Sequence, residues 1–171
     1  MQEIIRLNKE KIMLIQRKYL TNLEEKLGVK IEIDEEVLTV HGESSNVYFA
    51  IPVIKAISRG FSLEIAMLLK NTERSLKIIN LHDFCSNENC VSRLKARVIG
   101  KQGSIKTALE LATDSKISVY GHTISFIAPL YSSSKVEEAI NMILSGAKHS
   151  SVLGHLSKIK EQLFLEKLKG K

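Results

Sequence analysis

The sequence contains no tryptophan and only two cysteines and two prolines in 171 residues, and aromatic side chains make up 5% of it. Two cysteines are too few for a disulfide framework, which favours a reducing compartment, and we expect a cytoplasmic protein. No apolar run approaches the roughly 18 residues that a membrane helix needs, and the charged first eleven residues are unlike a secretory signal. Scarce proline and glycine argue against a disordered chain. These absences favour a globular protein that has no membrane contact.

Basic side chains are concentrated in the second half of the chain. The whole sequence carries 25 Lys and Arg against 19 Asp and Glu, a net charge of +6. Residues 1–80 hold 12 basic and 11 acidic side chains, whereas residues 81–171 hold 13 and 8. Such an excess is expected if the second half alone binds a polyanion such as a nucleic acid. The few aromatic rings disfavour a base-stacking platform made of exposed rings.

The apolar pattern of the chain repeats after a shift of 86 residues. Leu23-Glu24 then aligns with Leu109-Glu110, and Gly60 aligns with Gly146. Few residues are identical between the two copies, but the order of the predicted elements is the same. We therefore expect two similar units in tandem.

Each copy predicts a strand, a helical stretch, a hairpin and a closing helix, in that order. In the first copy the strand is at 3–7, the helical stretch at 12–27 and the hairpin at 29–33 and 37–40, and the closing helix runs to 58. In the second copy the strand is at 76–82, the helical stretch at 90–112 with a break at 100–103, and the hairpin at 117–120 and 123–127, and the closing helix ends at Gly146. Ser45 or Asn46 is the expected cap of the first closing helix. Ser134 and Glu137 form a capping box that predicts the start of the second.

The predicted fold is α+β, with two tandem β-α-α-β-β-α units, each a three-stranded sheet with helices on one face. Residues 1–72 form the first unit and residues 73–171 the second. Further helical segments are expected at 61–70 and 149–169. The C-terminal helix has apolar residues on one side, and we expect it to pack on the second sheet. Its lysines leave open a contact with RNA or a partner protein.

The segment Gly100-Lys101-Gln102-Gly103 separates two helical stretches of the second copy. Glycine tolerates the backbone angles of such a turn, and without Cβ atoms a phosphate–sugar backbone can approach closely. The N–H groups and dipole of the next helix then face the phosphate. Residues 91–109 carry five basic side chains and no acidic one. A G-x-x-G alone is a weak signal, but in this helix–helix break within a repeated unit it strongly indicates a phosphate site.

The segment from Ile99 to Ile105 resembles the signature loop of KH domains, which bind RNA and single-stranded DNA, and the order of elements resembles their type I arrangement. Residues 93–100, 117–121 and 146–150 are similar to archaeal and eukaryotic KH-domain assembly factors of the small ribosomal subunit, the Dim/Pno type. Residues 28–34 and 55–62 resemble the first domain of the same family. The resemblance covers nearly the whole chain.

This resemblance implies two tandem KH domains that bind RNA near the 3′ end of small-subunit ribosomal RNA during ribosome biogenesis and rRNA processing. It also implies contact with the endonuclease that trims this end and, in archaea, with the alpha subunit of translation initiation factor two. It implies no catalytic activity and no cofactor, and we expect a monomer. The candidate RNA-binding residues are Arg93, Arg97, Ile99, Gly100, Lys101, Gln102, Gly103, Ser104 and Lys106.

The first copy departs from the KH pattern. A shift of 86 residues places Gly100–Gly103 on residues 14–17, which contain no glycine, and the helical pattern is unbroken from Lys9 to Leu27. We therefore expect the first unit to lack the G-x-x-G loop and to pack against the second unit or dock a protein instead of clamping RNA.

Bases bound by a KH domain lie in a groove between the G-x-x-G helices and the second strand. The apolar candidates here are Val98, Ile99, Ile105, Ile117 and Val119, although a single residue of this kind is more often a plain core residue. Arg93 and Arg97 lie one helical turn apart, on the side expected to face the loop, so they can reach a phosphate or a base edge. The alternative is two arginines exposed to solvent.

Other constellations carry little chemistry. His82, Cys85 and Cys90 do not complete the four ligands of a structural zinc site, and we expect no metal. His122 occupies a hairpin turn, where a polar residue is common. No P-loop, dinucleotide fingerprint or nucleophile elbow is present, so we do not expect an enzyme.

Three hypotheses follow from the residues and the resemblance. The leading one is a non-enzymatic RNA-binding assembly factor whose second unit clamps a single strand. The alternative is a protein-interaction adaptor that docks a translation initiation factor subunit or a nuclease, with RNA contact secondary. A third is a KH subunit of another RNA machine, such as a degradation complex.

Overall fold

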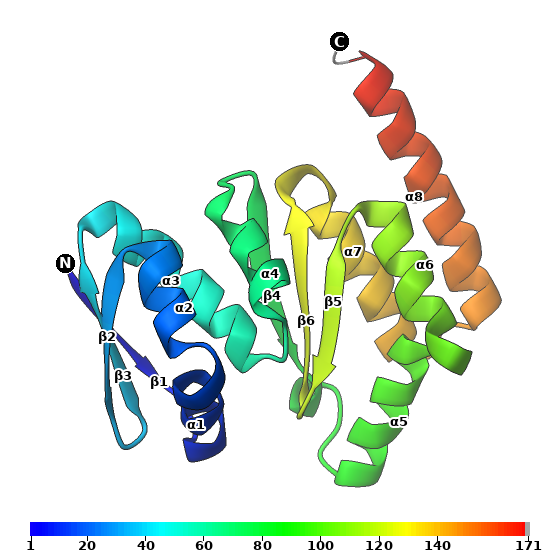
Figure 1. Ribbon diagram of the computed structural model, residues 1–171. Coiled ribbons are helices and arrows are strands. Elements are labelled where there is room, and N and C mark those ends of the chain that lie inside the picture. The colour runs from blue at the N-terminus through cyan, green and yellow to red at the C-terminus, as the bar shows by residue number, and fades with distance from the viewer. Residues whose placement is uncertain (170–171) are drawn as a thin grey trace. The chain divides into compact units, whose positions relative to one another are not determined.

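The chain divides into two units, one from Met1 to Asn71 and the other from Thr72 onward, as shown in the computed structural model of Figure 1. Residues 1–169 are described by the structure. Gly170 and Lys171, which belong to the predicted second domain, lie outside the described residues. Among the helices of residues 1–169, none combines the length and the apolar composition that crossing a bilayer requires.

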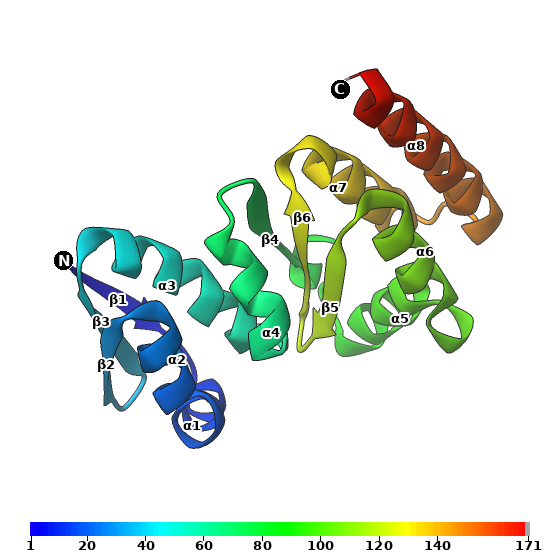
Figure 2. The ribbon, with the colours of Figure 1, turned by 45° about the horizontal axis from the view of Figure 1, so that its top comes forward.

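The first unit is built on an antiparallel sheet of three strands in the order β1-β3-β2. Its helices α1, α2 and α3 lie on one face of this sheet (Figures 1 and 2). The elements are β1 (Gln2–Arg6), α1 (Lys9–Lys18), α2 (Leu20–Leu27), β2 (Val29–Asp34), β3 (Val37–Gly42), α3 (Ser44–Ser58), the short α4 (Leu63–Ala66) and a 3-10 turn η1 (Met67–Lys70).

The second unit has the same plan, with an antiparallel sheet in the order β4-β6-β5 and helices α5, α6 and α7 on one face (Figures 1 and 2). Its elements are β4 (Arg74–Asn80), the 3-10 turn η2 (Leu81–Asp83), α5 (Glu88–Ile99), the 3-10 turn η3 (Lys101–Gly103), α6 (Ser104–Thr113), β5 (Lys116–Tyr120), β6 (Thr123–Pro129), α7 (Leu130–Leu144) and α8 (His149–Lys169). The predicted α+β fold of two β-α-α-β-β-α units is confirmed.

Backbone geometry repeats at the same spacing as the sequence from α2 onward. Helices α3 and α7 have identical lengths and are offset by the 86 residues of the repeat. Three pairs of positive φ angles occur at this spacing: Gly28 and Asp114 (63° and 52°), Glu35 and Gly121 (48° and 56°), and Gly60 and Gly146 (87° and 96°). The tandem repeat is therefore present in the backbone conformation as well as in the apolar pattern of the sequence.

One hydrogen bond holds the second helix of each unit to the edge strand beside it. The N–H of Ile31 donates to Oε1 of Glu24 at 2.9 Å, and the N–H of Ile117 donates to Oε1 of Glu110 at 2.7 Å. An edge strand has N–H groups with no strand neighbour. Each glutamate satisfies one of them and thereby fixes the distance between helix and strand.

Two predicted helix starts are wrong. Helix α3 begins at Ser44 without a side-chain cap, and the side-chain amide of Asn46 donates instead to the carbonyl of Gly28 at 3.1 Å. Helix α7 begins at Leu130, four residues before the proposed capping box. The hydroxyl of Ser132, buried within α7, donates to the carbonyl of Thr113 at 2.7 Å. Serines that bond to the backbone in this way can lie inside a helix.

The C-terminal helix α8 packs on α6 and α7 and not on the sheet, which corrects our expectation. Its buried residues are Val152, Leu156, Ile159 and Leu163, as its periodicity predicts, whereas Leu168 is exposed. Helices α6 and α7 already lie between α8 and the sheet (Figure 1). The apolar side of α8 therefore finds its partners on these helices.

Helix α6 offers a matched test of the core. Leu109 is fully buried and Leu111 is 73% exposed on the same helix. Leu109→Ala should lower the free energy of unfolding by about 2–5 kcal/mol, because it leaves a cavity in the core. Leu111→Ala should change it by less than about 0.5 kcal/mol. Urea denaturation followed by circular dichroism measures both, and equal losses would contradict this core.

Candidate nucleic-acid interface

The loop between α5 and α6 has a backbone that ordinary side chains rarely adopt. Three of its four residues have positive φ: Gly100 (74°), Gln102 (51°) and Gly103 (79°). None of these has a positive-φ counterpart 86 residues earlier in the described chain, unlike the three pairs of the scaffold. Within the described residues, this loop is therefore a feature of the second unit alone.

The two glycines of this loop are required for different reasons. A Cβ atom on Gly100 would lie 2.5 Å from Cγ1 of Ile105 and 2.8 Å from its backbone nitrogen, so the start of α6 packs directly on Gly100. A Cβ atom on Gly103 would meet nothing within 4 Å. Gly100 thus closes the turn, while Gly103 leaves open space where another backbone can approach.

The start of α6 is open and has exposed polar side chains and the positive charge of Lys101 beside it. Gly103 is its N-cap and has no side chain to accept a hydrogen bond from the first turn. The N–H groups of such a turn and the helix dipole favour an anion. Lys101, Gln102 and Ser104 are exposed around it. This arrangement suits one or more phosphate groups.

The structure gathers seven of the nine candidate residues around the loop and directs two elsewhere. Ile99 ends α5 and is 37% exposed, and Lys106 is half-buried in the first turn of α6. Arg97 instead donates from Nε to the carbonyl of Ile143 at 3.2 Å and from Nη2 to that of Ala147 at 2.6 Å. Arg97 thus bonds to the last turn of α7, at Ile143, and to the segment between α7 and α8, at Ala147, and so caps this end of the helix. Exposed Arg93 lies 3.6 Å from the sulfur of Cys90.

The five apolar candidates for the base groove divide into two groups. Val98, Ile105 and Ile117 are buried in the core of the second unit. Ile99 and the half-buried Val119 retain exposed surface. Tyr120, which ends strand β5 and is 38% exposed, alternates with Ile117 and Val119 along the strand and so lies on the other face of the sheet.

The N-terminal end of α5 carries a second group of side chains that the sequence did not reveal. His82, Glu88 and His122 lie together there, on three different elements. Cys85 and Cys90, considered with His82 in the sequence, are free cysteines and are half-buried. Partial burial raises the pKa of the Cys85 thiol to about 11, and its hydrogen bond with Cys90 acts in the same direction. Cys85 is therefore a thiol and not a thiolate at neutral pH.

The first unit joins its two helices without a glycine. The junction is at Tyr19, not at residues 14–17, which lie inside α1. Tyr19 has φ of −125°, and its N–H donates to the carbonyl of Ile15 at 2.9 Å. Because the chain passes from α1 to α2 through one residue, this junction differs from the four-residue loop of the second unit.

A helix, a G-x-x-G loop and a second helix, followed by an edge strand of a three-stranded antiparallel sheet, define a type I KH domain, a single-stranded nucleic-acid-binding module. A sequence model described as "Eukaryotic type KH-domain (KH-domain type I)" matches residues 75–161. The domain that this model describes is a binding module rather than a catalytic one.

Comparison with known proteins extends this likeness to both units. A KH domain-containing protein of Methanocaldococcus jannaschii is 34% identical and is matched over 94% of this chain and 75% of its own length. The pre-rRNA-processing protein pno1 of Aspergillus fumigatus is 25% identical over 64% of this chain and 45% of its own. The aDim2p chain in a crystal structure of an a/eIF2alpha–aDim2p–rRNA complex from Pyrococcus horikoshii is similar with a TM-score of 0.85, 27% identity and 95% coverage of both chains. The chain belongs to the Dim/Pno-type family of tandem KH-domain assembly factors of the small ribosomal subunit.

The two loop glycines should respond differently to the same substitution. Gly103→Ala should destabilise the protein by about 1–2 kcal/mol, the cost of a left-handed backbone with a Cβ atom. Gly100→Ala should cost a further 1–3 kcal/mol or so, because the added methyl group clashes with Ile105. Urea denaturation of both variants measures the difference, and a smaller loss for Gly100→Ala would contradict the close contact.

The two arginines of α5, Arg93 and Arg97, should differ in how much each contributes to the stability of the fold. Arg97→Ala removes two charge-assisted hydrogen bonds, one to the last turn of α7 and one to the segment after it, and should lower the free energy of unfolding by about 1–3 kcal/mol. Arg93→Ala, on the exposed side of the same helix, should change it by less than about 0.5 kcal/mol. Thermal denaturation of the two variants tests this, and an unchanged stability of Arg97→Ala would rule out a capping role.

Proposed function

We propose that the protein binds single-stranded RNA with its second unit, through phosphates held at Gly100–Gly103 and bases placed along strand β5. The observation that carries this proposal is the geometry of the loop. Gly100 packs on α6, Gly103 is open to solvent, and the uncapped first turn of α6 lies directly behind them. A phosphate at this point receives backbone N–H groups without displacing any side chain.

The charge around the loop supports the same proposal. Residues 91–109 carry no carboxylate, so no side chain from Val91 through the loop to the first turns of α6 repels a nucleic-acid backbone. Glu88, the first residue of α5, lies at the other end of this helix. Lys101 and Lys106 add positive charge close to the open turn. Arg97 contributes its charge to the field but uses its hydrogen-bond donors on α7.

The RNA that we propose is the 3′ end of small-subunit ribosomal RNA, during assembly of the subunit. The pre-rRNA-processing name of the Aspergillus relative and the rRNA in the Pyrococcus complex support an RNA of this class. The same complex contains a/eIF2alpha, which supports the alpha subunit of initiation factor two as a protein partner. The endonuclease that trims the RNA end is a further proposed partner.

A second function, docking of a protein partner, is favoured by one apolar surface of the second unit. Leu111 and Phe164 are 73% and 60% exposed. They line an open hollow of about 190 Å³ together with residues of α6, α7 and α8. Exposed apolar side chains that share a hollow are typical of protein contacts. This surface involves α8 and is separate from the G-x-x-G loop residues.

The test of RNA binding compares two pairs of identical substitutions. A labelled single strand that matches the rRNA 3′ end is titrated into the wild type and into Lys101→Asp/Gln102→Asp. The charge reversal places carboxylates where the phosphate would lie, so we expect at least a tenfold loss of affinity. Raising the salt should weaken wild-type binding with a log–log slope of roughly −0.7 per neutralised phosphate, and the variant should show a shallower slope.

The matched control is Lys18→Asp/Gln16→Asp, which makes the same two changes at the exposed helix junction of the first unit. This variant should bind RNA as the wild type does. Circular dichroism checks that both variants are folded. If the folded Lys101→Asp/Gln102→Asp variant binds RNA as tightly as the wild type, the loop is not the site. Binding of the initiation factor subunit that resists salt would then favour the docking function.

A further inference from the structure

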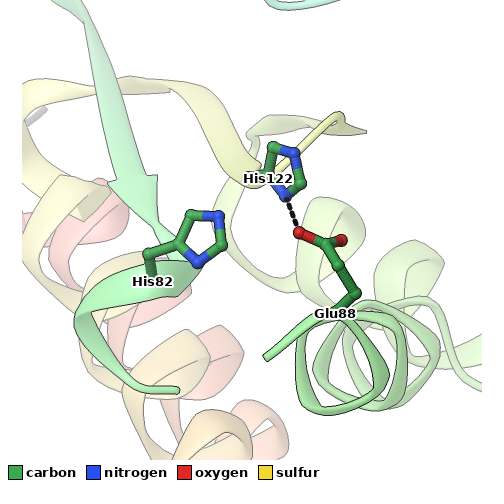
Figure 3. A group of neighbouring side chains, drawn as sticks. All are labelled: His82, Glu88 and His122. Carbon is green, nitrogen blue, oxygen red and sulfur yellow. Dashed lines mark ion pairs between the residues drawn. The ribbon is translucent and has the colours of Figure 1, made fainter. Parts of the chain in front are cut away.

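We propose that His82, Glu88 and His122 bind a divalent transition-metal ion of the zinc class at the end of α5 that is remote from the G-x-x-G loop. This site is independent of RNA binding by the loop. The three side chains come from η2, from the first residue of α5 and from the turn between β5 and β6, and Figure 3 shows them turned toward one another.

The distances suit a shared ion. One ligand atom from each of the three residues lies within 4.8 Å of the other two. Nδ1 of His122 is 3.6 Å from Oε1 of Glu88, drawn as a dashed line in Figure 3. The rings of His82 and His122 are 4.7 Å apart at their centroids, with 33° between their planes. An ion with ligand bonds of about 2.0–2.2 Å needs only small side-chain rotations to reach all three.

The backbone holds each of the three residues in place. The N–H of Leu81 donates to the carbonyl of His122 at 2.9 Å, which ties η2 to the hairpin turn. The N–H of His82 donates to the side chain of Asn80 at 3.1 Å. At the start of α5, the side chain of Asn87 accepts a hydrogen bond from the N–H of Cys90 at 2.8 Å, just beside Glu88. The ligand set is therefore preorganised, and only side-chain torsions remain to be fixed by the ion.

The donor types indicate the kind of ion. Two imidazole nitrogens and one carboxylate oxygen suit zinc and its neighbours, whereas magnesium and calcium prefer oxygen ligands throughout. Three protein ligands leave at least one coordination position for water or an added ligand. All three side chains are exposed, so the ion can enter directly from solvent.

A bound ion would tie the tip of the β5–β6 hairpin to α5. Strand β5 is the proposed wall of the RNA groove, and the ion would stiffen the end of this wall. Helix α5 has 12 residues, so at about 1.5 Å per residue the ion would lie some 17 Å or so along the helix axis from the G-x-x-G loop. The substitutions that test the metal site therefore leave the loop residues unchanged.

The test begins with removal of metal from the full chain by a chelator. Zinc is then titrated into the protein, and isothermal titration calorimetry measures the affinity and the stoichiometry. The wild type should bind one Zn²⁺ per chain. His82→Ala and His122→Ala should each weaken binding at least tenfold, and Glu88→Gln should weaken it while keeping the shape of the side chain. Circular dichroism confirms that these surface variants are folded. Acidification should weaken binding, because protonated imidazole does not ligate metal.

Two controls keep the result specific. His155 faces Glu138 at 3.4 Å with no second histidine in its pair, so His155→Ala should bind zinc as the wild type does. A Cys85→Ser/Cys90→Ser variant should also bind zinc as the wild type does. The wild type loaded with Co²⁺ should show no thiolate charge-transfer absorption. The proposal is overturned if the wild type takes up no stoichiometric ion at a few equivalents of zinc. Equal affinity of His82→Ala, His122→Ala and the wild type would overturn it as well.

Discussion

The hydrogen bond from the N–H of Ile117 to the carboxylate of Glu110 is the contact on which the proposed RNA-binding site of the second unit depends. It joins α6 to the edge strand β5 and so sets the separation between the two proposed walls of the groove. The N–H group belongs to a strand edge and would otherwise be left to solvent. The same bond links Glu24 and Ile31 in the first unit. Both units therefore use one device to hold a helix pair against a three-stranded sheet.

The loop at residues 100–103 joins the first two helices of the second unit, and it requires unusual backbone angles. Gly100 and Gly103 accept positive φ, and Gln102 adopts it despite its side chain. A left-handed conformation costs an ordinary residue about 1–2 kcal/mol. Packing of Ile105 on Gly100 holds the turn in this shape. The open first turn of α6 is a consequence, because a loop without a capping side chain leaves its N–H groups available.

Arg97 shows how a basic residue near a binding loop can serve the fold. Its guanidinium donates to one carbonyl in the last turn of α7 and to one in the segment that follows, so it fixes the third helix against the first. The positive charge of Arg97 still adds to the field around the loop, but two of its N–H donors are engaged in these bonds. The first unit has the same sheet and helices but no such loop. Its first two helices meet at Tyr19, whose N–H donates to the carbonyl of Ile15 in the preceding helix. This contrast separates the features that build a KH fold from those that we propose bind a phosphate.

Local patterns were enough to predict the order of the elements, the tandem repeat and the G-x-x-G loop, because periodicity, turn residues and glycines act over a few neighbouring positions. The helix starts at Ser44 and Leu130 were missed. In α7 the buried hydroxyl of Ser132 donates to the carbonyl of Thr113, far away in the chain, and to that of Pro129, the N-cap, and local sequence patterns do not show the first of these partners. The sequence also did not show that Arg97 bonds near the end of α7 or that α8 packs on α6 and α7, because these contacts depend on which helix surfaces the rest of the fold leaves uncovered. The group of His82, Glu88 and His122 arises only when a strand end, a helix start and a hairpin turn meet. The sequence by itself thus determined the units and their loop, whereas the tertiary structure decided which side chains face one another, because such contacts join residues far apart in the chain.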